Sequence, residues 1–132
     1  MDLMDLTPKS DEIVITLLHP NTEEIIKNDD GSDMSITVYA SHTKEYKKAM
    51  HEQANKRLKK AQKTKDQSFT SEDLEQASLD ILSKVTKDWN ITFKGEKPKM
   101  TLAKAREVFE SVFWIKDQVE VGLAEPLDFM KG

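Results

Sequence analysis

The hydrophobic period of the sequence changes at about residue 40, and this change limits the folds that the chain can adopt. Residues 34–39, Met-Ser-Ile-Thr-Val-Tyr, alternate apolar and polar side chains, which is typical of a half-buried β-strand. From Ser41 onward, apolar residues recur three and four positions apart, as on one face of an α-helix. The pattern predicts an α+β fold that is mainly helical, with a small N-terminal antiparallel β element at residues 12–40 and about three helices.

Three short strands are expected in the β element. Residues 12–18 are rich in β-branched side chains and predict the first strand. His19-Pro20-Asn21-Thr22 is a turn signal, and residues 23–27 are interpreted as the returning strand. The polar, glycine-containing residues 28–33 form a loop before the third strand at residues 34–39.

Three helices are expected after the β element. Ser41 is placed as the N-cap of a first helix that runs to about Thr64. A second helix starts after a cap at Thr70, with acids in its first turn, and keeps its apolar spacing as far as Trp89. Thr101 caps a third helix that Gly122 ends. The apolar side of the first helix is thin and carries Tyr46, Met50, Ala54, Leu58 and Ala61.

The length of 132 residues predicts a single domain. Within it we expect a flexible arm at residues 1–11, a helical part at residues 41–122 and a C-terminal tail at residues 123–132. The chain has no cysteine, which excludes disulfides, thiolate catalysis and cysteine-based zinc sites. We expect neither a secretory signal, because the first residues are acidic, nor a membrane span, because the longest apolar stretch, residues 13–18, is too short.

Charge is segregated along the sequence although the net charge is only -4. Residues 1–40 hold nine acids and two bases, whereas residues 41–65 hold nine bases and two acids. The acidic balance returns in residues 66–93, with six acids and two bases. Alternating blocks of charge in a short chain indicate contacts with partners or assembly more than catalysis.

The sequence contains no set of residues that indicates catalysis. His51-Glu52-Gln53-Ala54-Asn55 resembles a helical zinc motif, but Asn55 stands where the second histidine ligand would be needed. No nucleophile is accompanied by a base and an orienting partner, and the four glycines are too dispersed for a phosphate-binding loop. We therefore expect no catalytic residue, no metal, no cofactor and no enzymatic activity.

The basic stretch at residues 44–65 is the best candidate for contact with nucleic acid. Arg57 is its one arginine, although arginine would be expected for reading base edges, and no aromatic side chain lies on its lysine face. We expect no specific nucleic-acid binding; a solvated face or contact with an acidic protein surface is the preferred interpretation.

The C-terminal part is the richest in aromatic residues, and two interpretations of it remain open. Trp114 lies off the main apolar stripe of its helix, and further apolar residues follow the expected helix end. One interpretation is a wide face that packs into the core; the other is a surface that binds another protein, where Trp and Phe act as anchors. The candidate partner-binding residues are Phe113, Trp114, Ile115, Val119, Leu127 and Phe129.

Four segments, in this order, resemble the tail assembly chaperones of long-tailed, non-contractile bacteriophages. They are the turn at residues 19–22 with the acidic glycine loop and the strand at 34–39, the start of the basic helix at 41–49, the middle helix ending at Trp89, and Phe-Trp-Ile-Lys-Asp-Gln-Val at 113–119 with the later Phe129. The sequence departs from the family at Glu23 and Ala40, where such proteins commonly carry glycine.

The resemblance implies a protein of the infected host cytoplasm that is absent from the mature virion. It would bind the tape-measure protein, keep it soluble and promote assembly of the tail-tube protein around it. In many relatives a ribosomal frameshift adds a C-terminal extension that contacts the tube protein. Two alternatives stay open: a nucleic-acid-binding or regulatory phage protein that uses the helix at residues 44–65, and a structural tail component.

The charge blocks also predict self-association. An acidic patch of one molecule that meets the basic helix of the next makes a head-to-tail contact, which closes into a ring or continues as a spiral. The alternative is that the two blocks neutralise each other within one molecule. Lys48, Lys59 and Lys63 are the residues assigned to the contact.

Overall fold

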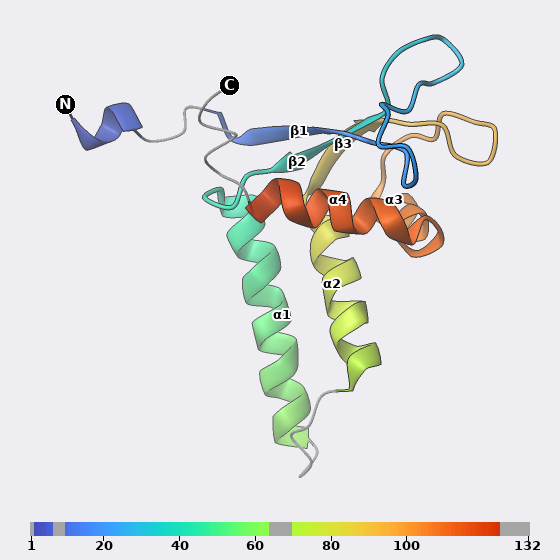
Figure 1. Cartoon of the computed structure of the whole chain (residues 1–132). Coiled ribbons are helices and arrows are strands. Elements are labelled where there is room, and N and C mark those ends of the chain that lie inside the picture. Colours follow the sequence, from blue (N-terminus) through green and yellow to red (C-terminus); the bar gives the residue numbers. More distant parts are fainter. Residues whose placement is uncertain (1, 7–9, 64–69, 125–132) are drawn as a thin grey trace.

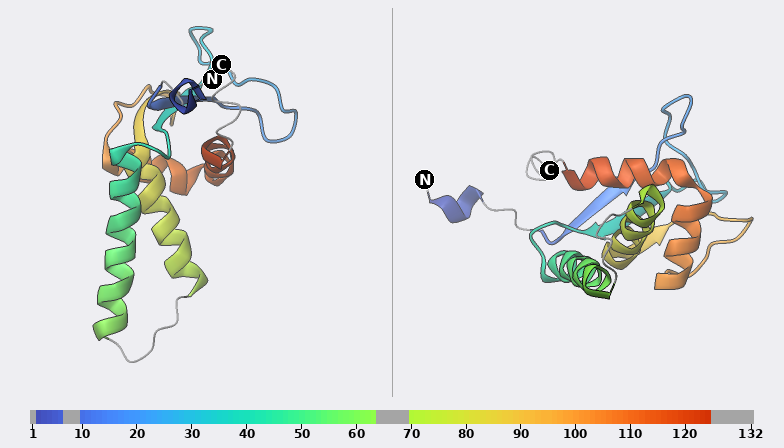
Figure 2. Two further views of the ribbon diagram at one scale, coloured as in Figure 1. Left: turned by 90° about the vertical axis from the view of Figure 1, so that its left-hand side faces the viewer. Right: turned by 90° about the horizontal axis from the view of Figure 1, so that it is seen from below.

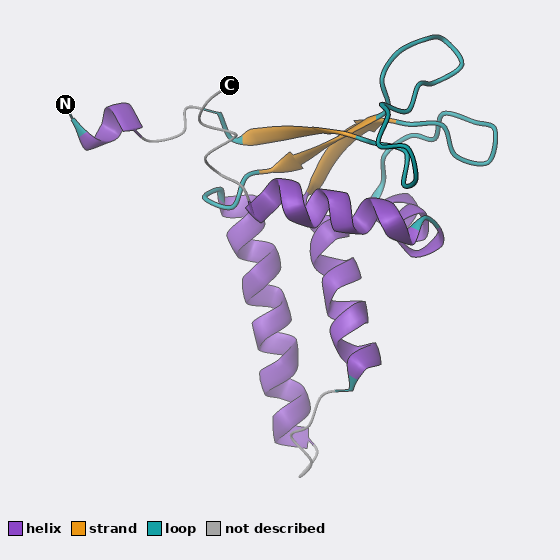
Figure 3. Ribbon diagram, in the orientation of Figure 1, coloured by secondary structure: helices purple, strands orange, loops and turns teal. Residues whose placement is uncertain are grey.

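A small antiparallel sheet lies over a set of four α-helices in the computed structural model, which describes residues 2–6, 10–63 and 70–124 (Figure 1). A 3-10 helix, η1 (Leu3–Leu6), precedes the sheet. The four α-helices lie on one side of the sheet, so its opposite face is not covered by any of them (Figure 3). The predicted α+β class is confirmed, but the number of α-helices in the described ranges is four and not three.

The sheet has the order β1 (Glu12–Thr16), β2 (Ser35–Tyr39) and β3 (Thr86–Asn90), with both pairs antiparallel. The first and last predicted strands of the β element are confirmed. The returning strand predicted at residues 23–27 is wrong; these residues contribute only single bridges, from Ile25 to Leu18 and from Lys27 to Asp33.

The third strand comes instead from the end of the segment that was predicted to be helical. Val85 and Trp89 are four residues apart, and a spacing of four fits a helix face and also one side of a strand. The spacing of the apolar residues therefore could not show whether the chain beyond Val85 is a helix or a strand. The central strand β2 has two edges to pair, and pairing with β3 satisfies the second of them.

Two long helices, α1 (Lys44–Lys63) and α2 (Ser71–Val85), form a hairpin that projects from the sheet (Figure 2). The predicted cap at Thr70 is confirmed: its side chain accepts from the N–H of Asp73, and the Asp73 carboxylate accepts from the N–H of Thr70. The cap predicted at Ser41 is wrong by two residues, because the hydroxyl that accepts from the N–H of Tyr46 belongs to the buried Thr43.

The single helix predicted from Thr101 to Gly122 is two helices, α3 (Leu102–Ser111) and α4 (Phe113–Ala124). The cap at Thr101 is confirmed, whereas Gly122 lies inside α4 and does not end it. A straight helix over this range would be about 34 Å long, twice the ~17 Å length of a five-residue strand. Because the chain bends at Val112, α4 turns back along the sheet and buries its own apolar side against it.

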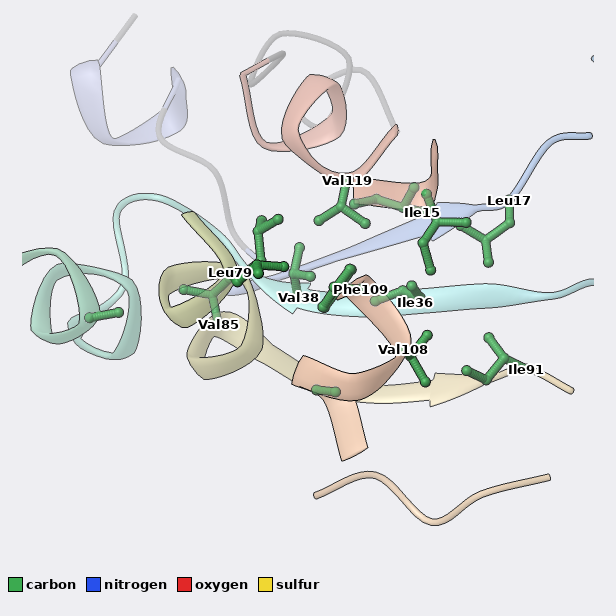
Figure 4. Close-up of a cluster of buried hydrophobic side chains, with 14 residues drawn as sticks. Ile15, Leu17, Ile36, Val38, Leu79, Val85, Ile91, Val108, Phe109 and Val119 are labelled. Atoms are coloured by element: carbon green, nitrogen blue, oxygen red, sulfur yellow. The ribbon is translucent and has the colours of Figure 1, made fainter. Parts of the chain in front are cut away.

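The core lies between the sheet and helices α2, α3 and α4, with the fully buried Phe109 of α3 among side chains from all three strands or their continuations (Figure 4). Ile36 and Val38 of the central strand face it.

Of the apolar side predicted for α1, Tyr46 packs against the core, but Met50 and Ala54 are exposed. Leu58 is 61 % exposed because the outer half of α1 extends past the body. The buried side chains of the described part of α1 are Ala49 and Gln53, which the prediction did not include.

Candidate partner-binding surface

An apolar groove with a volume of about 440 Å³ lies where α3 meets α4, beside the loops that extend from the strands. One wall follows the continuation of β1 and the loop before β2, and includes Leu17 and Met34. The other includes Val112 and Trp114 at the bend between the helices. The remaining lining residues are His19, Pro20, Asn21, Ile26, Ile91, Thr92, Phe93, Val108 and Ile115.

A network of polar side chains fixes the loop that forms the first wall. The buried Asn28 accepts from the Thr92 hydroxyl at 2.6 Å and donates to the Ser32 hydroxyl at 3.2 Å. Asn90 of β3 donates to the same Ser32 hydroxyl at 3.1 Å. These bonds fix the loop to β3 and so hold Ile26 and Met34 in the wall of the groove. They also give the polar side chains of the network the hydrogen-bond partners that buried groups need.

The acidic part of the same loop is paired with lysines. Lys97 donates to Asp30 at 2.6 Å, and this bond, helped by the Ser32 hydroxyl, holds the pKa of Asp30 well below its usual range. Asp33 accepts from Lys27. The carboxylates of Asp30 and Asp33 are therefore engaged within the molecule.

Phe113 is an exposed aromatic residue that lies next in sequence to residues lining the groove. It begins α4, stands between two lining residues in the sequence, and is 73 % exposed. Its neighbour Trp114 is half-buried and packs against the core. The bend at Val112 explains both positions, since it directs Phe113 outward while Trp114 lines the groove.

Two of the other predicted partner-binding residues are buried in the core, because they point from α4 toward the sheet. Ile115 belongs to the lining of the groove but is only 2 % exposed, and Val119 is fully buried and does not line it. For these two residues the core interpretation is correct. Leu127 and Phe129 lie outside the described residues.

The lysines of α1 divide into two groups. Lys56 and Lys60 bind carboxylates of α2, Asp80 at 3.3 Å and Asp73 at 2.7 Å. Lys48 and Lys59 are exposed and form no ion pair within the part of the chain that the structure describes. The side chain of Lys63 lies outside the described part.

Asp80 joins three helices, and nothing in its sequence context indicated this. Its carboxylate accepts from Gln53 and Lys56 of α1 and from Arg106 of α3. Arg106 also binds Gln76 of α2. A lone aspartate in an amphipathic helix is usually solvated, so this role became visible only once α1 and α3 were placed on either side of α2.

The described residues include no group of three or more His, Cys, Asp or Glu side chains that could hold a metal ion. None of the described helices has the length and the apolar character needed to cross a membrane. No family model matches the chain, and neither a curated protein nor a solved structure is significantly similar to it.

Proposed function

We propose that the chain is a phage tail assembly chaperone that binds the tape-measure protein and keeps it soluble while the tail tube assembles around it. The observation that carries the proposal is the apolar groove of about 440 Å³, together with the exposed Phe113, whose sequence neighbours Val112 and Trp114 line that groove. Two of the segments on which the family resemblance rests contribute to it: His19, Pro20, Asn21 and Met34 from the first, and Trp114 and Ile115 from the last.

The groove suits the chemistry of such a partner. A long amphipathic helix exposes an apolar stripe until the tube covers it, and a groove of this kind accepts anchors spaced three and four residues apart on that stripe. Met34 adapts its shape to different anchors. One groove of this size supports weak binding, which lets the growing tube displace the chaperone.

The remaining parts of the proposal concern place and partners. The protein acts in the host cytoplasm and leaves before the virion is complete. A longer, frameshifted form contacts the tail-tube protein, and copies of the chain associate head to tail along the tape-measure protein. The acidic loop at residues 28–33 and the outer end of α1 lie at opposite ends of the molecule (Figures 1 and 2), which is the arrangement that a head-to-tail contact requires.

Co-expression with the tape-measure protein of the same phage tests the proposal. The wild-type chain should co-purify with the tape-measure protein and raise its soluble fraction. Phe113→Ala should lower the affinity about tenfold, the loss typical of an aromatic anchor. Leu58→Ala is the matched control, because Leu58 is similarly exposed but lies on the outer half of α1.

Three results would contradict the proposal. They are the absence of co-purification, equal effects of Phe113→Ala and Leu58→Ala, and abundant chain in purified particles by mass spectrometry, which would indicate a structural tail component. Nucleic-acid binding by α1 is not favoured, because Lys56 and Lys60 are engaged with α2. Tight binding to a defined duplex near physiological salt would reverse this judgement.

A further inference from the structure

A second pocket lies at the base of the helical hairpin, between α1, the end of α2 and the start of α3. Its volume of about 380 Å³ falls within the ~300–1,000 Å³ that is typical of sites for small molecules. We call it the hairpin pocket; it shares no lining residue with the apolar groove. Its lining residues are Glu45, Lys48, Ala49, Glu52, Ser83, Lys84, Thr86, Met100 and Leu102.

The lining of the hairpin pocket includes a buried hydroxyl without a hydrogen-bond partner. Ser83 is 3 % exposed, and its Oγ bonds to no group in the described part of the chain. A serine or threonine in a helix often bonds to the C=O four residues earlier, as Thr86 at the end of α2 bonds to Leu82 at 2.7 Å. Ser83 makes no such bond. Because buried polar groups almost always have a partner, a free hydroxyl beside a pocket indicates that a ligand supplies one.

Two opposite charges at the mouth of the hairpin pocket are also unpaired. Glu45 and Lys48 lie on neighbouring turns of α1, are exposed, and form no ion pair within the described ranges. Glu52 and Lys84, in contrast, bind each other at 2.6 Å and so satisfy each other's charge. The pocket therefore offers a ligand one free carboxylate and one free ammonium group.

The side of the hairpin pocket toward α3 is apolar. Leu102 begins α3 and is 55 % exposed, and Met100 before it is partly buried against the core. The buried Ala49 of α1 lines the same pocket. An apolar body of a few carbons that lies among these three side chains would cover exposed apolar surface, which is favourable. Met100 can adapt to the shape of that body.

We propose that the hairpin pocket binds a small zwitterion with an apolar body, the chemistry of a free apolar amino acid such as leucine. The ligand carboxylate accepts from the Ser83 hydroxyl and from Lys48, its ammonium group donates to Glu45, and its side chain contacts Met100 and Leu102. A ligand with one charge would leave either Glu45 or Lys48 without a partner, and an anion would in addition be repelled by Glu45. The proposal is independent of the proposed function.

Leucine titrated into the full chain, followed by the amide chemical shifts in NMR, tests the proposal. The amides of Ala49, Ser83 and Leu102 should shift and saturate with a Kd of about 1 mM, as expected for so small a ligand. Two analogues each lack one charge: 4-methylpentanoate has no ammonium group and 3-methylbutylamine has no carboxylate. Each should bind about threefold more weakly than leucine, because exposed ion pairs contribute little.

Substitutions in the pocket identify the group that each part of the ligand contacts. Ser83→Ala should weaken leucine binding about fivefold through the lost hydrogen bond, and it should fold because the hydroxyl has no bond to lose within the protein. Ser78→Ala, in the same helix but outside the pocket, is the matched control. Lys48→Gln should weaken leucine and 4-methylpentanoate but not 3-methylbutylamine, and Glu45→Gln should weaken leucine and 3-methylbutylamine but not 4-methylpentanoate.

The titrations use a protein concentration at which the chain is monomeric, since Lys48 is also assigned to the predicted contact between molecules. The absence of saturable shifts with leucine up to about 20 mM would overturn the proposal. Shifts confined to the residues of the apolar groove would also overturn it. Equal effects of Ser83→Ala and Ser78→Ala, or equal binding of leucine and either analogue, would do the same.

Discussion

Glu23 adopts a backbone conformation that a residue with a Cβ atom rarely adopts. Its φ is 62°, in the left-handed region, and its N–H bonds to the C=O of His19 at 2.9 Å within the turn after β1. The left-handed conformation costs about 1–2 kcal/mol in a residue other than glycine.

Glu23→Gly should raise the free energy of unfolding by about 1 kcal/mol, since the relief of strain exceeds the entropy that glycine adds to the unfolded chain. Urea denaturation measures the change. Glu24→Gly is the matched control: residue 24 has no positive φ, so only the entropy term remains and stability should fall by about 0.5 kcal/mol. A loss of stability in both variants would show that the turn is not strained at residue 23.

At the scale of elements, the contact between α4 and β1 depends on a glycine that the sequence suggested for another role. Gly122 lets the helix approach so closely that an added Cβ would meet two carbons of Ile15 at 2.9 Å. Contacts this short force a shift in the core or in the helix. Gly122 therefore serves close packing and not termination of a helix.

Gly122→Ala should lower the free energy of unfolding by about 1 kcal/mol, because overpacking exceeds the ~1 kcal/mol that alanine gains in a helix. Thermal or urea unfolding measures the loss. In a double-mutant cycle with Ile15→Ala, the cost of the substitution at residue 122 should disappear, since the clashing carbons are gone. Independent, additive effects of the two substitutions would contradict the assigned contact.

The hairpin of α1 and α2 is joined by ion pairs that respond to pH. Lys84 binds Glu52 at 2.6 Å and lowers the pKa of Glu52 below its ordinary value of 4.5. The bond from Lys60 lowers the pKa of Asp73 below 3.8. Because both pKa values are lower in the folded chain, these carboxylates add stability above about pH 4.5, and that stability is lost as the pH falls through the folded values.

Stability measured by urea denaturation should therefore decrease from pH 7 to about pH 3, and the decrease should be smaller in the double variant Glu52→Gln, Asp73→Asn. Glu110→Gln, an exposed acid of α3 without an ion pair in the described structure, is the control and should keep the wild-type slope. An unchanged slope in the double variant would remove these two pairs from the pH response.

At the scale of the whole molecule, one of the described pairs joins the two charge blocks, between Asp11 and His42. Acids of the N-terminal block bind lysines elsewhere, as Glu12 binds Lys87 and Asp30 binds Lys97. The paired lysines of α1, Lys56 and Lys60, bind α2. Lys48 and Lys59 thus remain available for a contact between molecules.

Sedimentation velocity should show weak association that high salt reduces, because exposed charge pairs contribute little each and are screened. Reversal of Lys48, Lys59 and Lys63 to Glu should abolish it. Lys99→Glu, which reverses an exposed lysine outside α1, is the control. A monomer at every concentration, or oligomers that do not respond to the reversals in α1, would exclude electrostatic head-to-tail assembly.

Local signals in the sequence were enough to locate the two N-terminal strands, the starts of α2 and α3, and the α+β class. These features depend on neighbouring residues, such as the alternation in Ser35–Tyr39 and the hydroxyls of Thr70 and Thr101 that cap helix N-termini. The exposure of Phe113 leaves its role as a partner-binding residue a prediction. A property that is set within one turn or one strand can be read along the chain.

Only the tertiary structure decided where β3 begins, where the C-terminal helix bends and which residues form the groove. Val85 and Trp89 fit two periods, and pairing with β2 selected the strand. The apolar stripe of the C-terminal helical segment continues through Val112 without a break. The bend follows from the short strands, which are about half as long as a straight helix over this segment would be. Met34 and Trp114 meet in one groove because β2 and α4 pack on the same core, and a contact between residues so distant in sequence leaves no local pattern.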